Sequence, residues 1–345
     1  MLTRPLICIF HGPLVFDEGD AAWIARLLAP DSLVVAGVMG RTAARESGLP
    51  VSFADLPPSG VINGIDGDCI LVNRGKTPAS GRRFGEIVAS RIRQDRGLIH
   101  LECSDCTCYA WNGGNTQRAD EIAATLGYRM VALQSEDGDD PDLRQISGCL
   151  PGEPVMVEGI TIGHATSDHV ILSREAGRLV PVSGLCPKES GLLRLHARGC
   201  PPLDRAWCKT GPIRSIRPEE SHRTAPPCGR ISIIDHGALT IYRQITPDTC
   251  GILTIGDDTT LACGHIGAVA GVPVFGITDG DADGIVPEAY APGSVIVHVL
   301  SGTDDELGPE IAASIPNHRD LCWDMVVARL LEEFSDRICI LRDLR

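Results

Sequence analysis

Apolar runs and amphipathic stretches alternate through the first 134 residues. Four short apolar runs predict buried strands, at residues 6–10, 33–37, 69–72 and 98–101. Stretches with helical spacing follow them, near residues 21–29, 84–93 and 117–126, with a further short helix after residue 42. Strands that alternate with helices are typical of a parallel sheet covered by helices on both faces. The pattern predicts an α/β class protein with an N-terminal, doubly wound, mostly parallel sheet of the Rossmann-like kind over residues 1–134.

The pattern changes twice further along the chain. Residues 135–153 contain an acidic run with Gly and Pro, which predicts a solvated linker. Short β-like runs then predict a small β-rich domain without a long helix over 154–229, with strands at 155–162, 169–172, 179–182 and 192–196. From 230 to 345 the α/β alternation returns and predicts a C-terminal α/β domain, with strands at 252–255, 272–277 and 294–300.

The last predicted helix has the clearest apolar face. Its large apolar side chains recur at helical spacing: Trp323, Val326, Val327, Leu330, Leu331 and Phe334. Such a stripe is typical of a helix packed on a core rather than of a cofactor site. Asn317 is the predicted N-cap of this helix.

Composition limits the classes of partner. Lys and Arg number 31 against 45 Asp and Glu, a net charge of −14, and aromatic residues make up only 4%. An acidic chain with few aromatic residues argues against nucleic-acid binding. No stretch approaches the roughly 18 consecutive apolar residues of a membrane span, and no signal-peptide cleavage site follows the first strand. We therefore expect a cytoplasmic protein with neither a membrane nor a nucleic acid as partner; the pattern predicts no particular oligomeric state.

The chain has 14 cysteines, more than most proteins of its size. In the cytoplasm we expect core thiols or metal ligands rather than disulfides, with Cys8, Cys250 and Cys263 buried without metal. Cys103, Cys106 and Cys108 have ligand-like spacing, and Cys228 is one of several cysteines in or near the β-rich segment. Zinc or an iron–sulfur cluster at Cys103, Cys106 and Cys108 is an alternative hypothesis.

Charged residues follow the predicted N-terminal strands. The loops hold His11, Arg41, Thr42, Arg74, Lys76 and Glu102. Loops after parallel strands meet at one edge of a sheet. Basic side chains gathered there, in an otherwise acidic chain, indicate a small anionic ligand. His11 is the candidate proton-transfer group, with Arg41, Thr42, Arg74 and Lys76 as ligand-binding residues.

Two acidic clusters give the strongest signal for a functional site. Asp257 and Asp258 follow one predicted strand, and Asp279, Asp281 and Asp283 follow the next. If these strands are parallel neighbours, all five carboxylates lie at one sheet edge, where they repel one another unless a cation is bound. Oxygen ligands suit Mg²⁺. Thr259 and Thr260 open the following helix, where backbone N–H groups can bind a phosphate bridged by the metal.

The same residues also allow a structural interpretation. Asp258 is then an ordinary N-cap, and the segment from Asp279 to Asp283 is a solvent-exposed turn. Two functional hypotheses stand beside it. The first is an enzyme or binding protein for a phosphorylated small molecule with Mg²⁺. The second is a non-catalytic protein that holds a metal or cofactor through its cysteines.

Several of these motifs together resemble a known family. They are His11-Gly12-Pro13 with downstream Asp17 and Gly19, the stretch Gly256-Asp257-Asp258-Thr259-Thr260, and the stretch from Gly271 to Asp283. In these the chain is similar to an uncharacterised archaeal family, found mainly in methanogens, that carries a domain of unknown function. The resemblance implies an archaeal cytoplasmic protein linked to methanogen metabolism, and it implies no particular activity or substrate.

Overall fold

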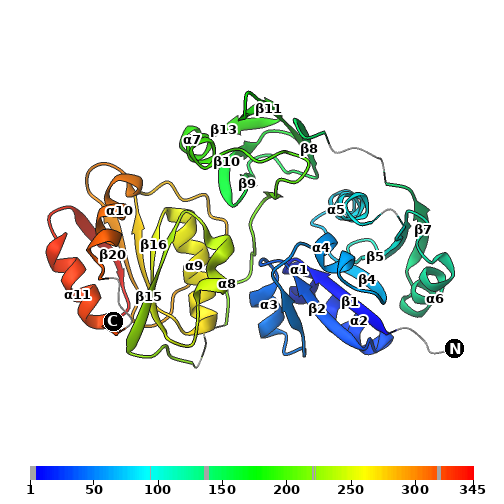
Figure 1. Ribbon diagram of the computed structural model, residues 1–345, viewed down its shortest axis with the longest axis horizontal. Coiled ribbons are helices and arrows are strands. Elements are labelled where there is room, and N and C mark those ends of the chain that lie inside the picture. Colours follow the sequence, from blue (N-terminus) through cyan, green and yellow to red (C-terminus); the bar gives the residue numbers. More distant parts are fainter. Residues whose placement is uncertain (1–4, 94, 136–139, 220, 222, 317–319) are drawn as a thin grey trace. The chain divides into compact units, whose positions relative to one another are not determined.

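The computed structural model describes residues 5–93, 95–135, 140–219, 221, 223–316 and 320–345. The chain forms two units, each assembled from separated segments, and Figure 1 shows their elements coloured along the chain. The N-terminal unit comprises the chain up to Glu153 together with His164–Pro187 and Arg198–Ala206. The C-terminal unit comprises Pro154–Gly163, Lys188–Ala197 and Trp207–Arg345. The segment predicted to be one β-rich domain, 154–229, is thus divided between the units.

A seven-stranded sheet lies at the centre of the N-terminal unit. Its strands are β1 (Leu6–His11), β2 (Ser32–Ala36), β3 (Ser52–Ala54), β4 (Asp68–Asn73), β5 (Leu98–Glu102), β6 (Thr107–Trp111) and β7 (Arg129–Leu133). They are ordered β3-β2-β1-β4-β5-β6-β7, and every neighbouring pair is parallel except β5 and β6. The predicted mostly parallel α/β sheet is confirmed. The sequence pattern missed β3, β6 and β7. Strand β6 runs antiparallel to β5 after the short loop that follows Glu102.

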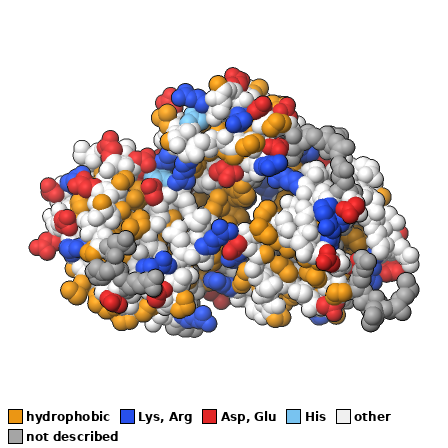
Figure 2. All heavy atoms as spheres, viewed as in Figure 1, with side chains coloured by type: hydrophobic (Ala, Val, Ile, Leu, Met, Phe, Trp, Pro, Cys, Tyr) orange, Lys and Arg blue, Asp and Glu red, His pale blue; other side chains and the backbone are white. Residues whose placement is uncertain are grey.

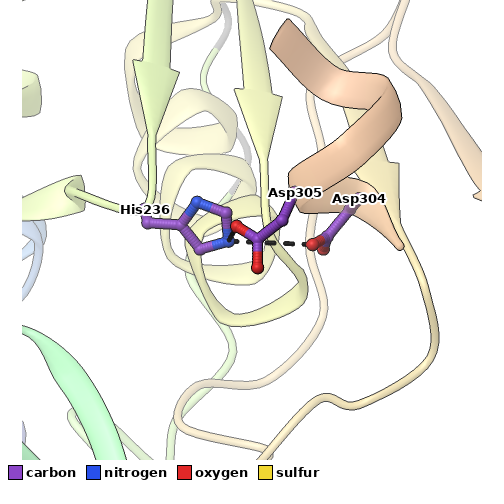
Figure 3. Close-up of side chains that lie close together, drawn as sticks. All are labelled: His236, Asp304 and Asp305. Carbon is purple, nitrogen blue, oxygen red and sulfur yellow. Dashed lines mark ion pairs between the residues drawn. The ribbon is translucent and has the colours of Figure 1, made fainter. Parts of the chain in front are cut away.

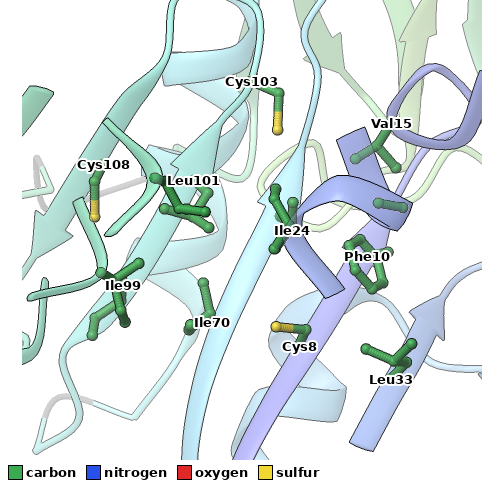
Figure 4. Close-up of a cluster of buried hydrophobic side chains, with 14 of the residues drawn as sticks. Cys8, Phe10, Val15, Ile24, Leu33, Ile70, Ile99, Leu101, Cys103 and Cys108 are labelled. Atoms are coloured by element: carbon green, nitrogen blue, oxygen red, sulfur yellow. The ribbon is translucent and has the colours of Figure 1, made fainter. Parts of the chain in front are cut away.

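Helices cover both faces of this sheet. They are α1 (Leu14–Asp17), α2 (Asp20–Leu28), α3 (Arg41–Glu46), α4 (Pro58–Asn63), α5 (Pro78–Arg91) and α6 (Thr116–Leu126). On one face, Phe10 and Ile70 pack with Ile24 of α2 and Ile122 of α6 (Figure 4 shows part of this core). On the other, residues of α4 and α5 form a second core with alternate residues of the same strands. Successive side chains of a strand point to opposite faces of the sheet, so each strand contributes buried residues to both cores.

Two glycines let α5 lie against polar side chains of β5. A Cβ atom on Gly81 would collide with the Glu102 carboxylate, and one on Gly85 would collide with the His100 ring. Both polar side chains are fully buried. The glycines therefore provide the space in which a buried polar network forms.

The network runs from Trp111 to Glu102. Trp111 Nε1 donates to His100 Nδ1 at 3.4 Å, His100 Nε2 lies 2.5 Å from Asn73 Oδ1, and Asn73 Nδ2 donates to Glu102 Oε2 at 2.9 Å. These contacts fit a neutral imidazole that carries its proton on Nε2. Burial lowers the pKa of His100 to about 3 and raises the pKa of Glu102. Each buried polar group thus has a partner, as burial requires.

Smaller elements connect the two main sheets. Strands β8 (Leu143–Ser147), β11 (His169–Glu175) and β12 (Arg178–Ser183) form an antiparallel sheet in the N-terminal unit, followed by β13 (Leu185–Pro187). Strand β8 lies within the segment predicted as a linker, 135–153. Strands β9 (Pro154–Val157), β10 (Ile160–Ala165) and β14 (Cys208–Thr210) lie side by side in the order β10-β9-β14.

The C-terminal unit contains a second mainly parallel sheet. Its strands are β15 (Cys228–Asp235), β16 (Thr249–Ile255), β17 (Val274–Thr278), β18 (Val295–Val299), β19 (Leu321–Cys322) and β20 (Ile338–Asp343). The order is β19-β15-β16-β17-β18-β20, in which β15 to β18 are parallel and the two outer strands antiparallel. The three predicted C-terminal strands correspond to β16, β17 and β18.

Helices again cover both faces. They are η1 (Ala238–Thr240), α8 (Ile241–Gln244), α9 (Asp257–Ala270), α10 (Asp304–Ser314) and α11 (Trp323–Glu333). Helices α10 and α11 lie on one face of the sheet and α9 lies on the other (Figure 1). Buried residues of α10 and α11 belong to one core cluster, and Cys263 of α9 belongs to another. Trp323, Val326, Val327, Leu330 and Phe334 are buried and Leu331 is partly buried, so the predicted apolar stripe is confirmed as core.

Two predictions of secondary structure are wrong. The strand predicted at 192–196 is part of helix α7 (Glu189–Arg198), because Glu, Leu, Arg and Ala all favour helix and no β-branched residue interrupts them. The last helix begins at Trp323, since the two residues before it form β19 and pair with β15. Asn317, its predicted N-cap, lies outside the described residues.

The expectation that the cysteines form no disulfide is also wrong. Cys228 and Cys322 are joined by a disulfide, because the antiparallel register of β15 and β19 places them opposite each other. Cys8, Cys250 and Cys263 are buried thiols, as expected. Two neighbouring strands thus determine a pairing that cysteine spacing cannot reveal.

The space at Gly85 gives a first testable prediction. We expect Gly85→Ala to lower the free energy of unfolding by about 1–3 kcal/mol, because the added methyl group collides with a fully buried ring. Gly60, in helix α4, is the matched control, since a Cβ there meets only ordinary contacts. Gly60→Ala should be neutral or stabilising by up to about 1 kcal/mol in the same urea titration. Equal stability of the two variants would contradict this packing.

The buried imidazole gives a second prediction. In the unfolded chain His100 takes up a proton below pH of about 6.5, whereas the folded chain does not until about pH 3. Stability therefore falls as the pH drops through this window. From pH 7.5 to 5.0 the unfolding free energy of the wild type should fall by about 2 kcal/mol more than that of His100→Gln. Glu102 and other titrating groups are common to both proteins, so equal losses would exclude this role of His100.

Candidate functional site

The parallel strands β15 to β18 each end in an acidic sequence. Since neighbouring strands run in the same direction, their C-terminal ends share one edge of the sheet. Eight aspartates follow these strand ends: Asp235, Asp257, Asp258, Asp279, Asp281, Asp283, Asp304 and Asp305. We call this set the acidic edge. All of it belongs to the C-terminal unit.

The predicted proximity of the two acidic clusters is observed. Asp257 and Asp258 begin helix α9, and their carboxylates accept hydrogen bonds from backbone N–H groups of the loop after β17. Asp257 Oδ2 accepts from Asp279 N at 2.9 Å, and Asp258 Oδ1 accepts from Asp283 N at 2.9 Å. Asp258 Oδ2 also accepts from the Thr161 hydroxyl, at 2.9 Å. The first aspartate pair thus fixes the loop that carries the second cluster.

Two basic side chains reach the acidic edge from the middle of the sequence. Lys188 Nζ donates to Asp283 Oδ2 at 2.8 Å and lies 3.1 Å from Asp281 Oδ2. Arg194, on helix α7, donates to Asp305 Oδ2 at 2.8 Å and to Asp304 Oδ1 at 3.4 Å. Neither contact could be predicted from local sequence patterns, because about 90 to 110 residues separate the partners.

His236 is the third basic group at this edge. Its Nδ1 contacts Asp235, while Nε2 lies 3.7 Å from Asp304 Oδ1 and 3.4 Å from Asp305 Oδ1 (Figure 3). Burial disfavours the charged ring, but the three carboxylates outweigh it and raise the pKa of His236 to about 9. The imidazole is therefore held in its protonated form near neutral pH when only protein groups surround it.

Negative charge nevertheless remains in excess. Eight aspartates face Lys188, Arg194 and His236, which leaves five negative charges uncompensated by these three groups when every carboxylate is ionised. Burial raises the pKa of Asp257 to about 6, and the charges of Asp304 and Asp279 add to the effect. Such a shift means that the ionised carboxylate is destabilised where it lies. A bound cation would relieve this repulsion.

A small cavity of about 30 Å³ opens within the acidic edge. Its lining includes Lys188, Arg194, His236, Asp257, Thr259 and Asp281. Two groups of side chains offer ligand atoms within 4.8 Å of one another, namely Asp257 with Asp279 and Asp281, and His236 with Asp304 and Asp305. Basic side chains, carboxylates and the first residues of helix α9 thus line one small cavity.

The two predicted threonine ligands differ in their surroundings. Thr259 lines the cavity. Thr260 is fully buried, and its hydroxyl contacts the Thr254 hydroxyl at 2.8 Å. The backbone N–H of Thr260 bonds to the carbonyl of Gly256 as an ordinary helical group.

The predicted N-terminal ligand residues lie at a common sheet edge of the other unit. The register pairs His11 with Asn73 and Asn73 with Glu102, so the loops after these strands begin side by side. Each basic side chain there has a carboxylate partner: Arg41 pairs with Asp55, Arg74 with Asp20, and Lys76 with Glu153. Thr42 is buried at the start of α3, and the His11 ring stacks on Phe84.

Cys103 and Cys106 lie in the turn between β5 and β6, and Cys108 lies in β6. Cys103 and Cys108 are buried in the N-terminal core, and Figure 4 shows their side chains among apolar neighbours. Cys106 is exposed, at a positive φ of 54°. The three cysteines are thus spaced along the turn and the second strand of a β-hairpin. Zinc or an iron–sulfur cluster at this position stays a sequence-based prediction.

Comparison with known proteins places the chain in a family. Residues 8–319 match the model of a family described as "Uncharacterized protein conserved in archaea (DUF2117)". The chain belongs to this archaeal family. An uncharacterized protein of Methanocaldococcus jannaschii is 31% identical over 361 aligned positions, which cover 96% of this chain and 97% of the relative. No solved structure shows significant similarity to the chain. The resemblance inferred from the sequence motifs is confirmed.

Two further features of this archaeal protein concern the apolarity of its helices and the charges on its surface. Within the described residues, no helix has the length and apolar character needed to cross a membrane. Figure 2 shows Lys and Arg side chains interspersed with Asp and Glu on the visible face.

Lys188 provides a test of the electrostatics at the acidic edge. Lys188→Met should lower the free energy of unfolding by roughly 2–4 kcal/mol, because the largely buried Asp283 then loses the ammonium group that lies 2.8 Å from its Oδ2 atom. Mg²⁺ should restore part of this loss, since it supplies positive charge at the same place. Lys209, which donates to the carbonyl of Thr210, is the control. The prediction fails if Lys209→Met and Lys188→Met behave alike in chemical denaturation with and without Mg²⁺.

Proposed function

We propose that this archaeal protein binds an anionic, phosphorylated small molecule together with a divalent cation at the acidic edge. The observation that supports it most is the combination of several carboxylates with Lys188 and Arg194 around one small cavity. Carboxylates alone attract a cation, and basic side chains alone attract an anion. Both kinds of group at one cavity favour a ligand in which a metal ion bridges protein carboxylates and a phosphate.

Asp257, Asp279 and Asp281 are the proposed cation ligands. Their ligand atoms approach one another closely enough to share one ion. The Oδ1 atom of Asp279 is buried and has no hydrogen-bond donor within the described part of the chain. Oxygen ligands of this kind are those of Mg²⁺, which keeps several water molecules and binds phosphate oxygens through the positions that remain.

Lys188, Arg194 and the first turn of α9 are the proposed anion ligands. Helix α9 spans 14 residues, and the backbone N–H groups of its first turn have no partner within the helix. The helix dipole adds partial positive charge at this end. Arg194 can present two parallel N–H donors to phosphate oxygens, which Lys188 cannot. This assignment keeps the predicted phosphate position at the start of α9, beside Thr259 and Thr260. It replaces the predicted basic ligand residues of the N-terminal unit by Lys188 and Arg194.

Metal dependence of stability tests the cation. Millimolar Mg²⁺ should raise the melting temperature of the chelator-treated full chain by several degrees, because only the folded state offers the site. The double variant Asp279→Asn, Asp281→Asn should lose this response while its metal-free stability stays equal or rises, since like charges are removed. KCl at matched ionic strength controls for charge screening. A wild-type melting curve unaffected by Mg²⁺ would refute the cation site.

Anion binding separates the two candidate positions. With pyrophosphate as probe, calorimetric titration should detect binding that requires Mg²⁺ and that weakens at least about tenfold in Arg194→Gln. Arg74→Gln is the matched control, because Arg74 also pairs with an aspartate but lies in the N-terminal unit. If Arg74→Gln abolishes binding and Arg194→Gln does not, the anion binds in the N-terminal unit and the proposal is wrong.

A further inference from the structure

The second ligand group at the acidic edge contains a histidine. His236 follows strand β15, and Asp304 and Asp305 begin helix α10. Figure 3 shows the imidazole directed toward the two carboxylates. Its Nε2 atom lies 3.4 Å from Asp305 Oδ1 and 3.7 Å from Asp304 Oδ1. One imidazole nitrogen and two carboxylates are thus aimed at a common point.

Asp304 indicates that a ligand belongs at this point. Its side chain is fully buried, with 0% exposure, and its Oδ2 atom has no hydrogen-bond donor among the described residues. A buried carboxylate oxygen without a donor or a cation is costly, and native proteins rarely retain one without a reason. Arg194 contacts only the other oxygen, at 3.4 Å. An ion bound between Asp304 and His236 would satisfy the remaining oxygen.

The position of His236 is fixed by two neighbours. Asp235 contacts Nδ1, which directs Nε2 toward the two carboxylates. A carboxylate on the far nitrogen is the usual support of a metal-binding histidine. Gly256 has a φ of 104°, and a Cβ there would lie 2.7 Å from His236 Cδ2. The glycine before Asp257 therefore leaves the space that the ring occupies.

We propose that His236, Asp304 and Asp305 bind a divalent transition-metal ion of the Mn²⁺, Co²⁺ or Zn²⁺ class. One imidazole with two carboxylates is a donor set typical of these ions, whereas Mg²⁺ prefers oxygen ligands only. The site goes beyond the proposed function and is independent of it, because it uses none of Asp257, Asp279 and Asp281. His236 of this site lines the same cavity as Asp257 and Asp281, so the acidic edge would have two neighbouring cation positions of different chemistry.

Cobalt is a suitable probe, because its visible absorption changes with the ligands and the geometry of the bound ion. We expect the chelator-treated full chain to bind one equivalent of Co²⁺ in the presence of excess Mg²⁺. His236→Gln should weaken this binding at least about tenfold. Asp305→Asn should weaken it as well, and its partly exposed side chain makes this variant the safer one for folding. His169→Gln is the matched control, since His169 also contacts a preceding aspartate, Asp168, and its side chain is partly exposed.

Two results would overturn the site. One is a wild-type chain that binds no Co²⁺, and the other is wild-type affinity in folded His236→Gln and Asp305→Asn. The variant Asp281→Asn separates this site from the proposed function. It should keep Co²⁺ binding while losing the Mg²⁺ response. Co²⁺ binding without any Mg²⁺ response in the wild type would contradict the proposed function alone.

Discussion

Carboxylates that gather at one edge of a sheet repel one another, and the C-terminal unit is organised around that repulsion. The parallel order of β15 to β18 brings four strand ends together, and each end carries aspartates. Backbone N–H groups hold Asp257 and Asp258, and three basic side chains approach the others. These contacts fix loops and helix ends in place without cancelling the charge. The arrangement therefore holds the loops in place with more carboxylates than these three basic side chains can balance, which is the basis of the cation binding proposed above.

The residues of this site that directly follow apolar strands can be predicted from the sequence. Asp257 and Asp279 directly follow apolar strands, and parallel neighbours bring such residues to one edge. The same argument applies to Asp235 and His236 after β15 and to Asp304 at the start of α10. Each follows an apolar run, so the signal for them was present in the sequence. It was missed because a single aspartate or histidine after a strand is common, whereas two paired clusters are not.

The rest could not be predicted from local patterns. Lys188 and Arg194 meet the acidic edge only because a distant segment packs there. The loops of the N-terminal unit show the opposite case, since their basic residues were predicted correctly to share an edge but each has a carboxylate partner. Charge patterns identify which residues lie at an edge, and only the tertiary contacts show which charges are compensated. The wrongly predicted strand at 192–196 has a different origin, because the helix propensity of its residues was present in the sequence and was overlooked.

The discontinuous chain path has a consequence for how the protein is inherited. Lys188 and Arg194 belong to a ten-residue segment, Lys188–Ala197, that lies between two segments of the N-terminal unit. A gene fragment that started at Trp207 would encode all eight aspartates and His236 but neither of these basic residues. Recombination at that boundary would yield an acidic sheet edge without its main counter-charges. A division of the chain at Trp207 therefore separates the eight aspartates from both of these basic side chains.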